Sequence, residues 1–452
     1  MTLKFFLPDW EDRIDPNFDF VNDKFSFKHK ENPYKNDIYA HEILNNPYDG
    51  ILISLSLFQS KLNLKPNGKE EILIRDKKNI RDYLRIPKDS RIETLGDCGA
   101  FSYVRNEEPP KPFFSTENVS NIYEKLGFDY GVSVDHMAVS FVMEKEPGDL
   151  RRRRREFSEK ERMRRIALTV SNAKEFLDHH KEKKYKFTPI GVVQGINKET
   201  YAAGVKELVG YGYDYLALGS LVGYSTKEII NILSFIKPHI GDAKLHLFGV
   251  LRPHELKNFE RLGVVSFDSA SYLRKAWLRS GQNYLSIDQK WYAAIRVPYS
   301  TQQKVSDGAL KIHIGQKQLK LMEENALTAL REYEKGHLPL NDTLDKVMEY
   351  DDLLLRSSND GQSLRKKYEI TLKDKPWEKC GCAFCRTNGI DSLIFRGSNR
   401  NKRRGFHNTW LFNNYLKSCC VEQILKQPGV RVASYPPLPE LLSISCNRPC
   451  VS

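Results

Sequence analysis

The fold of this chain is indicated most clearly by residues 215–236, which read YLALGSLVGYSTKEIINILSFI. The apolar, strand-forming residues at its start predict a buried strand over Tyr215–Leu218. The sequence Ser225-Thr-Lys-Glu228 is a capping box, whose side chains satisfy the free N–H groups that open a helix. Apolar residues then recur on one helical face, at Ile229, Ile232, Leu233 and Ile236. This stretch is therefore one strand–helix unit.

The same alternation extends from about residue 50 to residue 300. Short apolar runs alternate with amphipathic helices, which predicts a parallel sheet covered by helices. An open doubly wound sheet and a (β/α)8 barrel fit this pattern about equally well. No glycine-rich phosphate loop follows the first strand, which argues against a nucleotide cofactor. The predicted strands are Ile51–Phe58, Ile92–Leu95, Tyr130–Val134, Ile190–Val193, Tyr215–Leu218, Leu245–Phe248 and Val264–Phe267.

The composition sets the class of protein. The chain has 452 residues, of which 40% are apolar, and carries 71 Lys+Arg against 58 Asp+Glu for a net charge of +13. A core of ordinary size is expected, with neither a signal peptide nor an apolar run long enough to span a membrane. Eight cysteines in so long a chain are not a disulfide scaffold, so we expect a cytoplasmic protein. The positive excess favours an acidic partner such as nucleic acid.

Two clusters hold much of the basic charge. The first lies within residues 151–165 and the second within residues 396–404. Either cluster can be a solvated surface, but we expect both to contact the phosphates of a nucleic acid. The residues assigned to this role are Arg151, Arg152, Arg153, Arg154, Arg155, Arg400, Lys402, Arg403 and Arg404.

Polar residues and glycines follow the predicted strands where each strand ends. They are Asp97, Asp135, Gln194, Gly219, Gly249 and Asp268. A single polar residue in that position is usually a helix cap or a turn former. In a barrel, however, the carboxyl ends of the strands form the rim on which catalytic groups gather. Three carboxylates and an amide along one sheet predict a catalytic site there.

A cysteine cluster predicts a metal site. Cys380, Cys382 and Cys385 lie within six residues, and His407, which we expect to open the last helix, follows 22 residues after Cys385. Three thiolates and an imidazole suit a tetrahedral zinc ion, and four protein ligands make such a site structural rather than catalytic. Ordinary buried thiols are the alternative, and Cys419 or Cys420 could replace His407 as the fourth ligand. A zinc-dependent hydrolase is disfavoured because no coordination position stays open.

Taken together, these motifs resemble those of the guanine transglycosylases, which exchange guanine in nucleic acid for a 7-deazaguanine base. The cysteine pattern followed by His407-Asn408 matches the zinc motif of that family. The other matches, in chain order, are Asp97-Cys-Gly-Ala-Phe101, Val193-Gln-Gly195, Leu216-Ala-Leu-Gly219, His246-Leu-Phe-Gly-Val250 and Phe267-Asp268. Their order and spacing agree over about residues 50–420, apart from the additions described below.

The resemblance implies a (β/α)8 barrel with an inserted structural zinc subdomain. Residues 1–300 would form most of the barrel, and residues 301–375, rich in Lys, Glu and Leu, would form an insertion of two or three helices. The remaining boundaries would be 376–407 for the zinc subdomain, 408–426 for the last barrel helix and 427–452 for an irregular tail.

Departures from the family pattern point to one of its branches. Cys98 and Ala100 replace a serine and a glycine, and Ser269-Ala-Ser-Tyr-Leu-Arg-Lys275 replaces the Pro-Thr-Arg of the transfer-RNA enzymes. The arginine run and the helical block are additions. These changes resemble the DNA-guanine transglycosylases of bacterial DNA-modification systems.

The resemblance also implies roles for the rim residues. Asp268 would be the nucleophile and Asp97 the general acid and base, because base exchange with retention needs two displacements at the sugar carbon. Asp135 would bind the guanine N1–H and amine. Gln194, Gly219 and Ser220 would bind its O6 side. Phe101 and Phe248 would stack on the flipped base, although both can equally be core residues.

Several questions stay open at this stage. The polymer is DNA by resemblance, but transfer RNA would support the same chemistry. The incoming base would be a 7-deazaguanine such as preQ0. A partner protein such as an ATPase could be needed to open the DNA. A non-catalytic nucleic-acid-binding partner subunit is a further alternative, which the presence of both Asp97 and Asp268 opposes.

Overall fold

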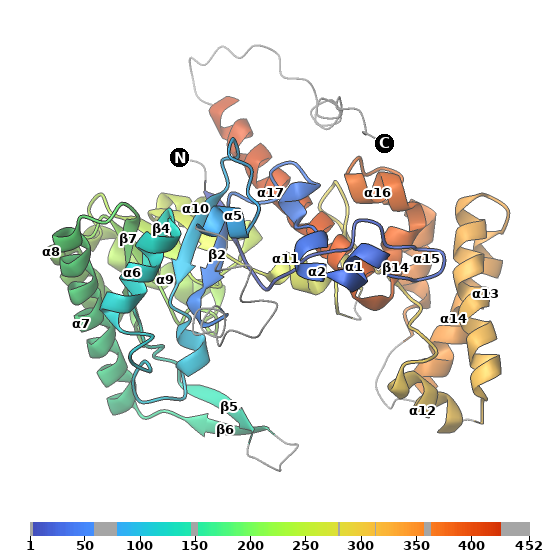
Figure 1. Ribbon diagram of the computed structural model, residues 1–452, viewed down its shortest axis with the longest axis horizontal. Helices are drawn as coiled ribbons and strands as arrows, with labels where there is room; N and C mark the ends of the chain where they lie inside the picture. The colour runs from blue at the N-terminus through green and yellow to red at the C-terminus, as the bar shows by residue number, and fades with distance from the viewer. Residues whose placement is uncertain are drawn as a thin grey trace. The chain divides into compact units, whose positions relative to one another are not determined.

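The computed structural model describes residues 3–57, 79–145, 152–278, 281–311, 313–356 and 363–425. The chain divides into two compact units (Figure 1). The barrel unit consists of Met1–Trp10 and Tyr48–Ala270, and the helical unit consists of Glu11–Pro47 and Ser271–Ser452.

Eight parallel strands of the barrel unit form a closed barrel, in the order β1-β10-β9-β8-β7-β4-β3-β2. Closure confirms the (β/α)8 barrel and excludes the open sheet. The strand β1 was not predicted, and the other seven strands lie within a few residues of their predicted positions. The strands are β1 Lys4–Pro8, β2 Gly50–Ser54, β3 Glu93–Asp97, β4 Tyr130–Val132, β7 Thr188–Val193, β8 Tyr215–Leu218, β9 Lys244–Leu247 and β10 Val264–Asp268.

Apolar side chains fill the core of the barrel unit, and helices follow its strands. A buried cluster includes Phe6, Leu95, Val132, Ile190 and Ala217. The predicted capping box at the start of α9 is present, with both of its reciprocal hydrogen bonds formed. The helices of this unit are α5 Ile80–Tyr83, α6 Thr116–Leu126, α7 Glu159–Lys183, α8 Lys198–Tyr211, α9 Thr226–Ile236 and α10 Leu256–Arg261, with 3-10 turns η2 Ala100–Tyr103, η3 Lys237–His239 and η4 Pro253–Glu255.

An antiparallel hairpin lies between β4 and α7. It pairs β5, Phe141–Lys145, with β6, Arg152–Glu156. The arginine run therefore lies on a strand, and Figure 1 shows the hairpin extending away from the strands and helices of the barrel unit.

The helical unit contains the other described helices and two short strand pairs. Its helices are α1 Phe27–Glu31, α2 Pro33–Asn36, α11 Ser271–Lys275, α12 Gln303–Lys311, α13 Gln316–Glu334, α14 Leu340–Arg356, α15 Arg365–Asp374, α16 Ala383–Asn388 and α17 Gly397–Leu425, with η1 Ala40–Glu42 and η5 Gly389–Leu393. The strands pair as β11 Tyr284–Leu285 with β12 Trp291–Tyr292, and β13 Ile295–Arg296 with β14 Ile394–Phe395.

Three details differ from the sequence-based expectations. Residues 271–300 group with the helical unit rather than with the barrel. Residues 301–375 hold four helices, and α13 packs against α14 through buried residues such as Leu330 and Val347. His407 lies inside α17, which begins ten residues earlier at Gly397. The tail at 427–452 lies outside the described residues.

Candidate functional site

The predicted rim residues lie together at one end of the barrel. Because all eight strands are parallel, the residues that end them or follow them share one edge. Ligand atoms of Asp97, Cys98 and Asp135 all lie within 4.8 Å of one another. Hydrogen bonds extend this group to Gln194 and Ser220.

Asp135 is the centre of the polar network. One carboxylate oxygen accepts the Cys98 thiol at 3.1 Å, and the other accepts Nε2 of Gln194 at 2.6 Å. The Ser220 hydroxyl donates to Oε1 of Gln194 at 2.6 Å and so fixes the amide with its NH₂ group toward Asp135. Asp135 is buried, which raises its pKa, while the bonds from Cys98 and Gln194 oppose that rise. These contacts hold the carboxylate in one orientation.

Gly219 contributes space rather than a donor, which corrects one prediction. Its N–H donates to the carbonyl of Val193 at 3.0 Å, and its carbonyl accepts the Tyr201 hydroxyl. The N–H is thus engaged within the barrel and is not free to bind a base. A Cβ at this position would lie 2.3 Å from Nε2 of Gln194. Glycine is therefore required for Gln194 to lie across it.

Asp97 ends β3 and is followed by a sharp turn. Gly99 has a φ of +88° and donates its N–H to Oδ2 of Asp97 at 3.1 Å. A Cβ on Gly99 would lie 2.6 Å from the Ser54 hydroxyl. Both this close approach and the positive φ therefore require glycine at this position. Burial, together with the nearby carboxylates of Asp135 and Asp268, raises the pKa of Asp97 to about 8. Near neutral pH this group is largely a protonated acid.

Asp268 is held by neighbours that donate to one of its oxygens. Oδ1 lies 2.9 Å from the N–H of Gly249 and 3.2 Å from Nε2 of His246. His246 is fully buried, and its Nδ1 lies 2.6 Å from the hydroxyl of Ser266. His246 was expected only as part of a family motif, without a role of its own. A histidine within the apolar run Leu245–Phe248 was the available signal.

The two candidate stacking residues differ in environment. Phe101 lies on η2, and its side chain is 78% exposed. Phe248 is partly buried, contacts His246 edge to face at 4.9 Å and packs against the core cluster of the barrel. Phe101 is thus an open ring beside the site, whereas Phe248 belongs in part to the core.

The cysteine cluster is a candidate metal centre in the helical unit. Its four side chains are buried, and their ligand atoms all lie within 4.8 Å of one another. Nδ1 of His407 lies 3.7, 3.3 and 3.6 Å from the sulfurs of Cys380, Cys382 and Cys385. A tetrahedral ion with ordinary zinc–sulfur and zinc–nitrogen bonds requires sulfur–nitrogen edges of about 3.6 Å. The sulfur–nitrogen distances of the cluster are therefore compatible with such an ion.

The protonation of His407 also fits a ligand role. Nε2 lies 2.7 Å from the carbonyl of Leu285, which can only accept, so Nε2 carries the proton. In the neutral ring the lone pair of Nδ1 then faces the three sulfurs. The ring stacks on Tyr284, whose hydroxyl lies 3.2 Å from the sulfur of Cys385. The side chains of the alternative ligands, Cys419 and Cys420, lie outside the described residues.

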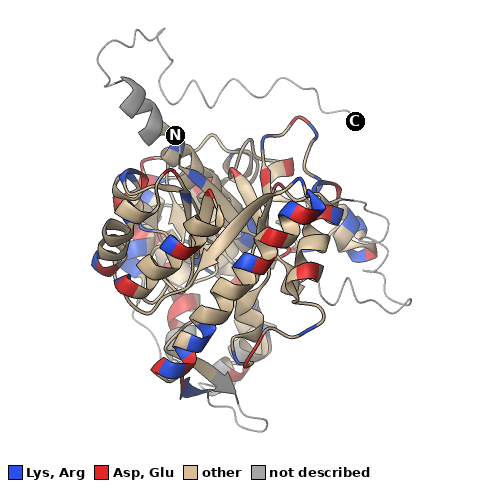
Figure 2. Cartoon of the chain, turned by 90° about the vertical axis from the view of Figure 1, so that its left-hand side faces the viewer, with Lys and Arg blue, Asp and Glu red and all other residues tan. Residues whose placement is uncertain are grey.

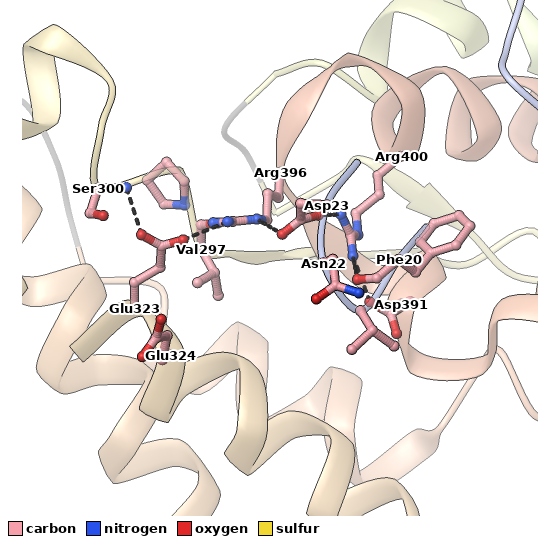
Figure 3. A network of polar contacts seen from close by, with 12 residues as sticks. Phe20, Asn22, Asp23, Val297, Ser300, Glu323, Glu324, Asp391, Arg396 and Arg400 are labelled. Carbon is pink, nitrogen blue, oxygen red and sulfur yellow. Dashed lines mark hydrogen bonds and ion pairs between the residues drawn. The ribbon is translucent and has the colours of Figure 1, made fainter. Parts of the chain in front are cut away.

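The second basic cluster is not an exposed surface, which corrects that prediction. Arg400 is buried and bonds to Asp23, Asp391 and the carbonyl of Phe20 (Figure 3). Arg396 likewise pairs with Asp23 and Glu323. Arg400 links α17 to the segment 11–47, and Arg396, which directly precedes α17, links the same segment to α13 of this unit.

The other members of this cluster are also engaged. Arg403 donates to the carbonyl of Asp15, and Arg404 to the carbonyl of Ala276, each at 2.6 Å. Lys402 is half-buried with Nζ 3.6 Å from Asp12. Phosphate binding by Arg400, Arg403 and Arg404 would require breaking interior contacts, so we withdraw this role for them.

The first basic cluster keeps its exposed position. Arg153, Arg154 and Arg155 are exposed on β6. The distribution of basic residues over the chain can be followed in Figure 2, where Lys and Arg are blue. Arg152 belongs to the same strand, although its side chain is not among those described, and Arg151 lies outside the described residues. Within the described chain, no helix combines the length and the apolar character needed to cross a bilayer.

The chain has a closed (β/α)8 barrel with polar residues at its strand ends, and a cysteine–histidine cluster that could hold a metal ion. The chain belongs to the queuine tRNA-ribosyltransferase family, whose model matches residues 111–393. It is 36% identical over 425 residues to the DNA-guanine transglycosylase of Salmonella montevideo, a match that covers 92% of this chain and 97% of that protein. It is 26% identical over 250 residues to the tRNA-guanine(15) transglycosylase of Sulfolobus acidocaldarius, covering 54% of this chain and 43% of that protein. The chain is therefore a transglycosylase, an enzyme that transfers pentosyl groups.

Proposed function

We propose that this enzyme exchanges guanine in DNA for a 7-deazaguanine base such as preQ0, through a covalent aspartyl–glycosyl intermediate. The name and the nearly complete coverage of the Salmonella montevideo relative support DNA as the polymer. The contrast between two rim carboxylates carries the chemistry, because Asp97 is an acid with a pKa of about 8, whereas Asp268 is fixed by the N–H of Gly249. Two carboxyl groups in different environments can divide the roles of acid and nucleophile.

In the first step, Asp268 attacks C1′ of the target nucleotide. Gly249 and His246 contact Oδ1, so we assign the attack to Oδ2. The bond from C1′ to guanine breaks, and its electron pair leaves with guanine, which takes the proton of Asp97. The sugar remains joined to Asp268 as an ester.

In the second step, the incoming base attacks the same carbon. Asp97, now a carboxylate, takes the proton of the attacking ring nitrogen. The new glycosidic bond forms as the ester breaks, and Asp268 is regenerated as a carboxylate. Two inversions at C1′ give retention, and neither step needs an external oxidant or cofactor.

Asp135 and Gln194 are proposed to read the base. The carboxylate of Asp135 retains acceptor capacity for a guanine N1–H and amine, because each oxygen has two lone pairs and one donor in place. Gln194 has a second N–H that can donate to O6, and Ser220 holds the amide in that orientation. Phe101 would stack on the flipped base, and Phe248 would close the pocket wall.

The metal of the cysteine cluster is proposed to be a structural zinc ion. Cys380, Cys382, Cys385 and His407 would hold it, as their distances and burial support. When bound, the ion supplies folding stability rather than catalysis, since four protein ligands leave no position for a substrate. The exposed arginines of β6 are proposed to bind phosphates.

Transfer RNA is the alternative polymer. It is favoured by the name of the matching family and by the Sulfolobus acidocaldarius relative. A non-catalytic partner subunit is opposed by the intact pair Asp97 and Asp268. The proposal includes a partner protein, such as an ATPase, that opens the DNA.

Mass spectrometry of nucleosides would test the polymer and the base. DNA and transfer RNA would be digested from cells with the gene, without it, and with an Asp268→Asn copy. We expect a deazaguanine nucleoside in DNA only where the wild-type gene is present. Its appearance in transfer RNA alone would overturn the DNA assignment, and its persistence with Asp268→Asn would overturn the nucleophile.

A further inference from the structure

We propose that the β5–β6 hairpin is an arm that enters the major groove of double-stranded DNA beside the target base. The inference rests on the proposed function and deepens it, because it names the duplex as the form of nucleic acid bound. The hairpin offers apolar side chains as well as the positive charge of the arginine run. The hairpin has two distinct faces, of which one is anchored in the barrel unit and the other is exposed.

The register of the hairpin defines these faces. Opposite residues of an antiparallel pair share a face, and successive residues alternate. Met143 lies opposite Arg154, and Phe141 lies opposite Glu156, so these four form the outer face. Val142 lies opposite Arg155 on the inner face.

The inner face is fixed to the loop that follows β3. Val142, Phe157 and Val104 form a small buried cluster of their own. Arg165 of α7 covers Phe157 at 3.9 Å and donates to the carbonyl of Val104 at 2.9 Å. Arg105 donates to the carbonyl of Met143 at 2.8 Å. The root of the hairpin is therefore part of the barrel unit rather than a loose loop.

The outer face combines charge with apolar surface. Phe141 is 40% exposed and Met143 is 42% exposed, and Arg154 is exposed on the same face. Arg153 and Arg155 are exposed on the other face of β6, because successive residues of a strand alternate. The guanidinium of Arg154 lies 4.0 Å from the centre of the Phe141 ring, and its Nε lies 3.1 Å from Oε1 of Glu156 in a solvent-exposed ion pair that a phosphate could replace. Arginine reads guanine edges and apolar groups contact thymine methyls, while neighbouring arginines pair with phosphates. The hairpin thus presents apolar side chains and Arg154 for base edges, and its strand β6 carries further exposed arginines for phosphates.

The dimensions of the hairpin favour one kind of groove. A two-stranded ribbon fits the major groove of B-form DNA, which is about 12 Å wide, without the widening that the minor groove of about 6 Å would need. The major groove of A-form RNA is deep and narrow, and side chains do not reach its bases. A groove-entering ribbon thus selects duplex DNA over duplex RNA.

The anchoring loop also carries residues of the catalytic site. Val104 and Arg105 directly follow η2, which bears Phe101. Tyr103, in the same turn, donates its hydroxyl to the carbonyl of Asp135 at 3.0 Å. A duplex held by the hairpin would therefore lie next to the ring proposed to stack on the flipped base.

Binding measurements can test this arm separately from catalysis. We would compare the wild type with a Phe141→Ala, Met143→Ala double variant and with Arg154→Ala. The control is Arg261→Ala, an exposed arginine at the end of α10. It lies at the end of the barrel opposite to the carboxyl ends of the strands. The probes are one sequence as duplex DNA, as single-stranded DNA and as duplex RNA. Since the altered side chains are exposed, unchanged thermal unfolding would verify the fold.

We expect both hairpin variants to lose about tenfold or more in affinity for duplex DNA and less than twofold for the other two probes. Arg261→Ala should match the wild type. Equal losses on all three probes would show that the hairpin is only a general positive surface, and would overturn the proposal. An unchanged affinity for duplex DNA would also overturn it. Failure of the proposed function is read separately, from base exchange on single-stranded DNA, because that assay does not require the arm.

Discussion

The amide of Gln194 donates to the carboxylate of Asp135 at 2.6 Å, between residues that follow two neighbouring barrel strands, β7 and β4. Both groups are buried, and Ser220 holds the far side of the amide. The orientation of the proposed base-reading carboxylate is thus set before any base arrives. Such preorganisation reduces the cost of ordering the site on binding.

Replacing Asp135 by Asn should abolish guanine recognition more than it affects folding. The amide would present a donor toward the guanine N1–H and amine, and hydrogen bonds to charged groups contribute about 1.5–3 kcal/mol each. We therefore expect kcat/KM for base exchange to fall by roughly a hundredfold or more. The control is Asp214→Asn, an exposed carboxylate that precedes β8 at the opposite end of the barrel. Steady-state kinetics with guanine would detect the difference, and wild-type values for Asp135→Asn would contradict the assignment.

Asp97 should make the stability of the barrel depend on pH. Its pKa is raised to about 8 in the folded chain, against a value near 4 when unfolded. The folded state therefore holds this proton more tightly, and the stability present below pH 4 is lost as the pH rises to about 8. Asp97→Asn removes this loss, so its melting temperature should exceed that of the wild type by an amount that grows from pH 4 to pH 8 and then levels off. A constant difference across this range would refute the shifted pKa, while the variant should lack exchange activity at every pH.

Cys382→Ser should remove the metal. We expect about one zinc ion per wild-type chain by elemental analysis, and a loss of both metal and thermal stability in the variant, because binding energy at such sites is folding energy. Cys98→Ser is the matched control, since Cys98 is equally buried but belongs to the other cluster. A metal-free chain that stayed folded and fully active would show that the site is dispensable.

Arg400→Met should destabilise the helical unit. The substitution leaves the partly buried carboxylates of Asp23 and Asp391 without one of their partners, and breaking a buried ion pair from one side costs about 3–5 kcal/mol, which is an upper range here. Denaturant unfolding should show this loss, whereas Arg386→Met, at an exposed position on α16, should leave stability nearly unchanged. If Arg400→Met unfolded like the wild type but lost nucleic-acid binding, the surface role that we withdrew would have to be restored.

Most of the barrel could be predicted because its strands are short apolar runs separated by amphipathic helices. The strand β1 was missed, since Lys4–Pro8 is a five-residue run that ends in proline and has no such neighbour before it. The hairpin was missed because five consecutive arginines have no strand pattern. Its fold depends on pairing with Phe141–Lys145 and on Arg165, which packs on Phe157.

The environments of the site residues were harder to predict than their positions. Nothing local indicates that Arg400 is buried, because its partner Asp23 lies 377 residues away in the chain. The raised pKa of Asp97 depends on carboxylates from two other strand ends. The N–H of Gly219 looked available because the contact with Val193 is made across strands.

The placement of β1 has a consequence for how the chain is made. Phe6 pairs with Asp268 in the register of β1 and β10, so the first strand supports the proposed nucleophile from 262 residues away. The chain also passes from the barrel unit into the helical unit at residue 11 and returns at residue 48. A growing polypeptide therefore cannot close its barrel until residue 268 has left the ribosome, and the early strand must wait for a late one. Such long-range pairing slows folding and prolongs the exposure of unpaired strand edges. A chain that terminates before β10 would lack the proposed nucleophile and would also keep both barrel edges open to aggregation.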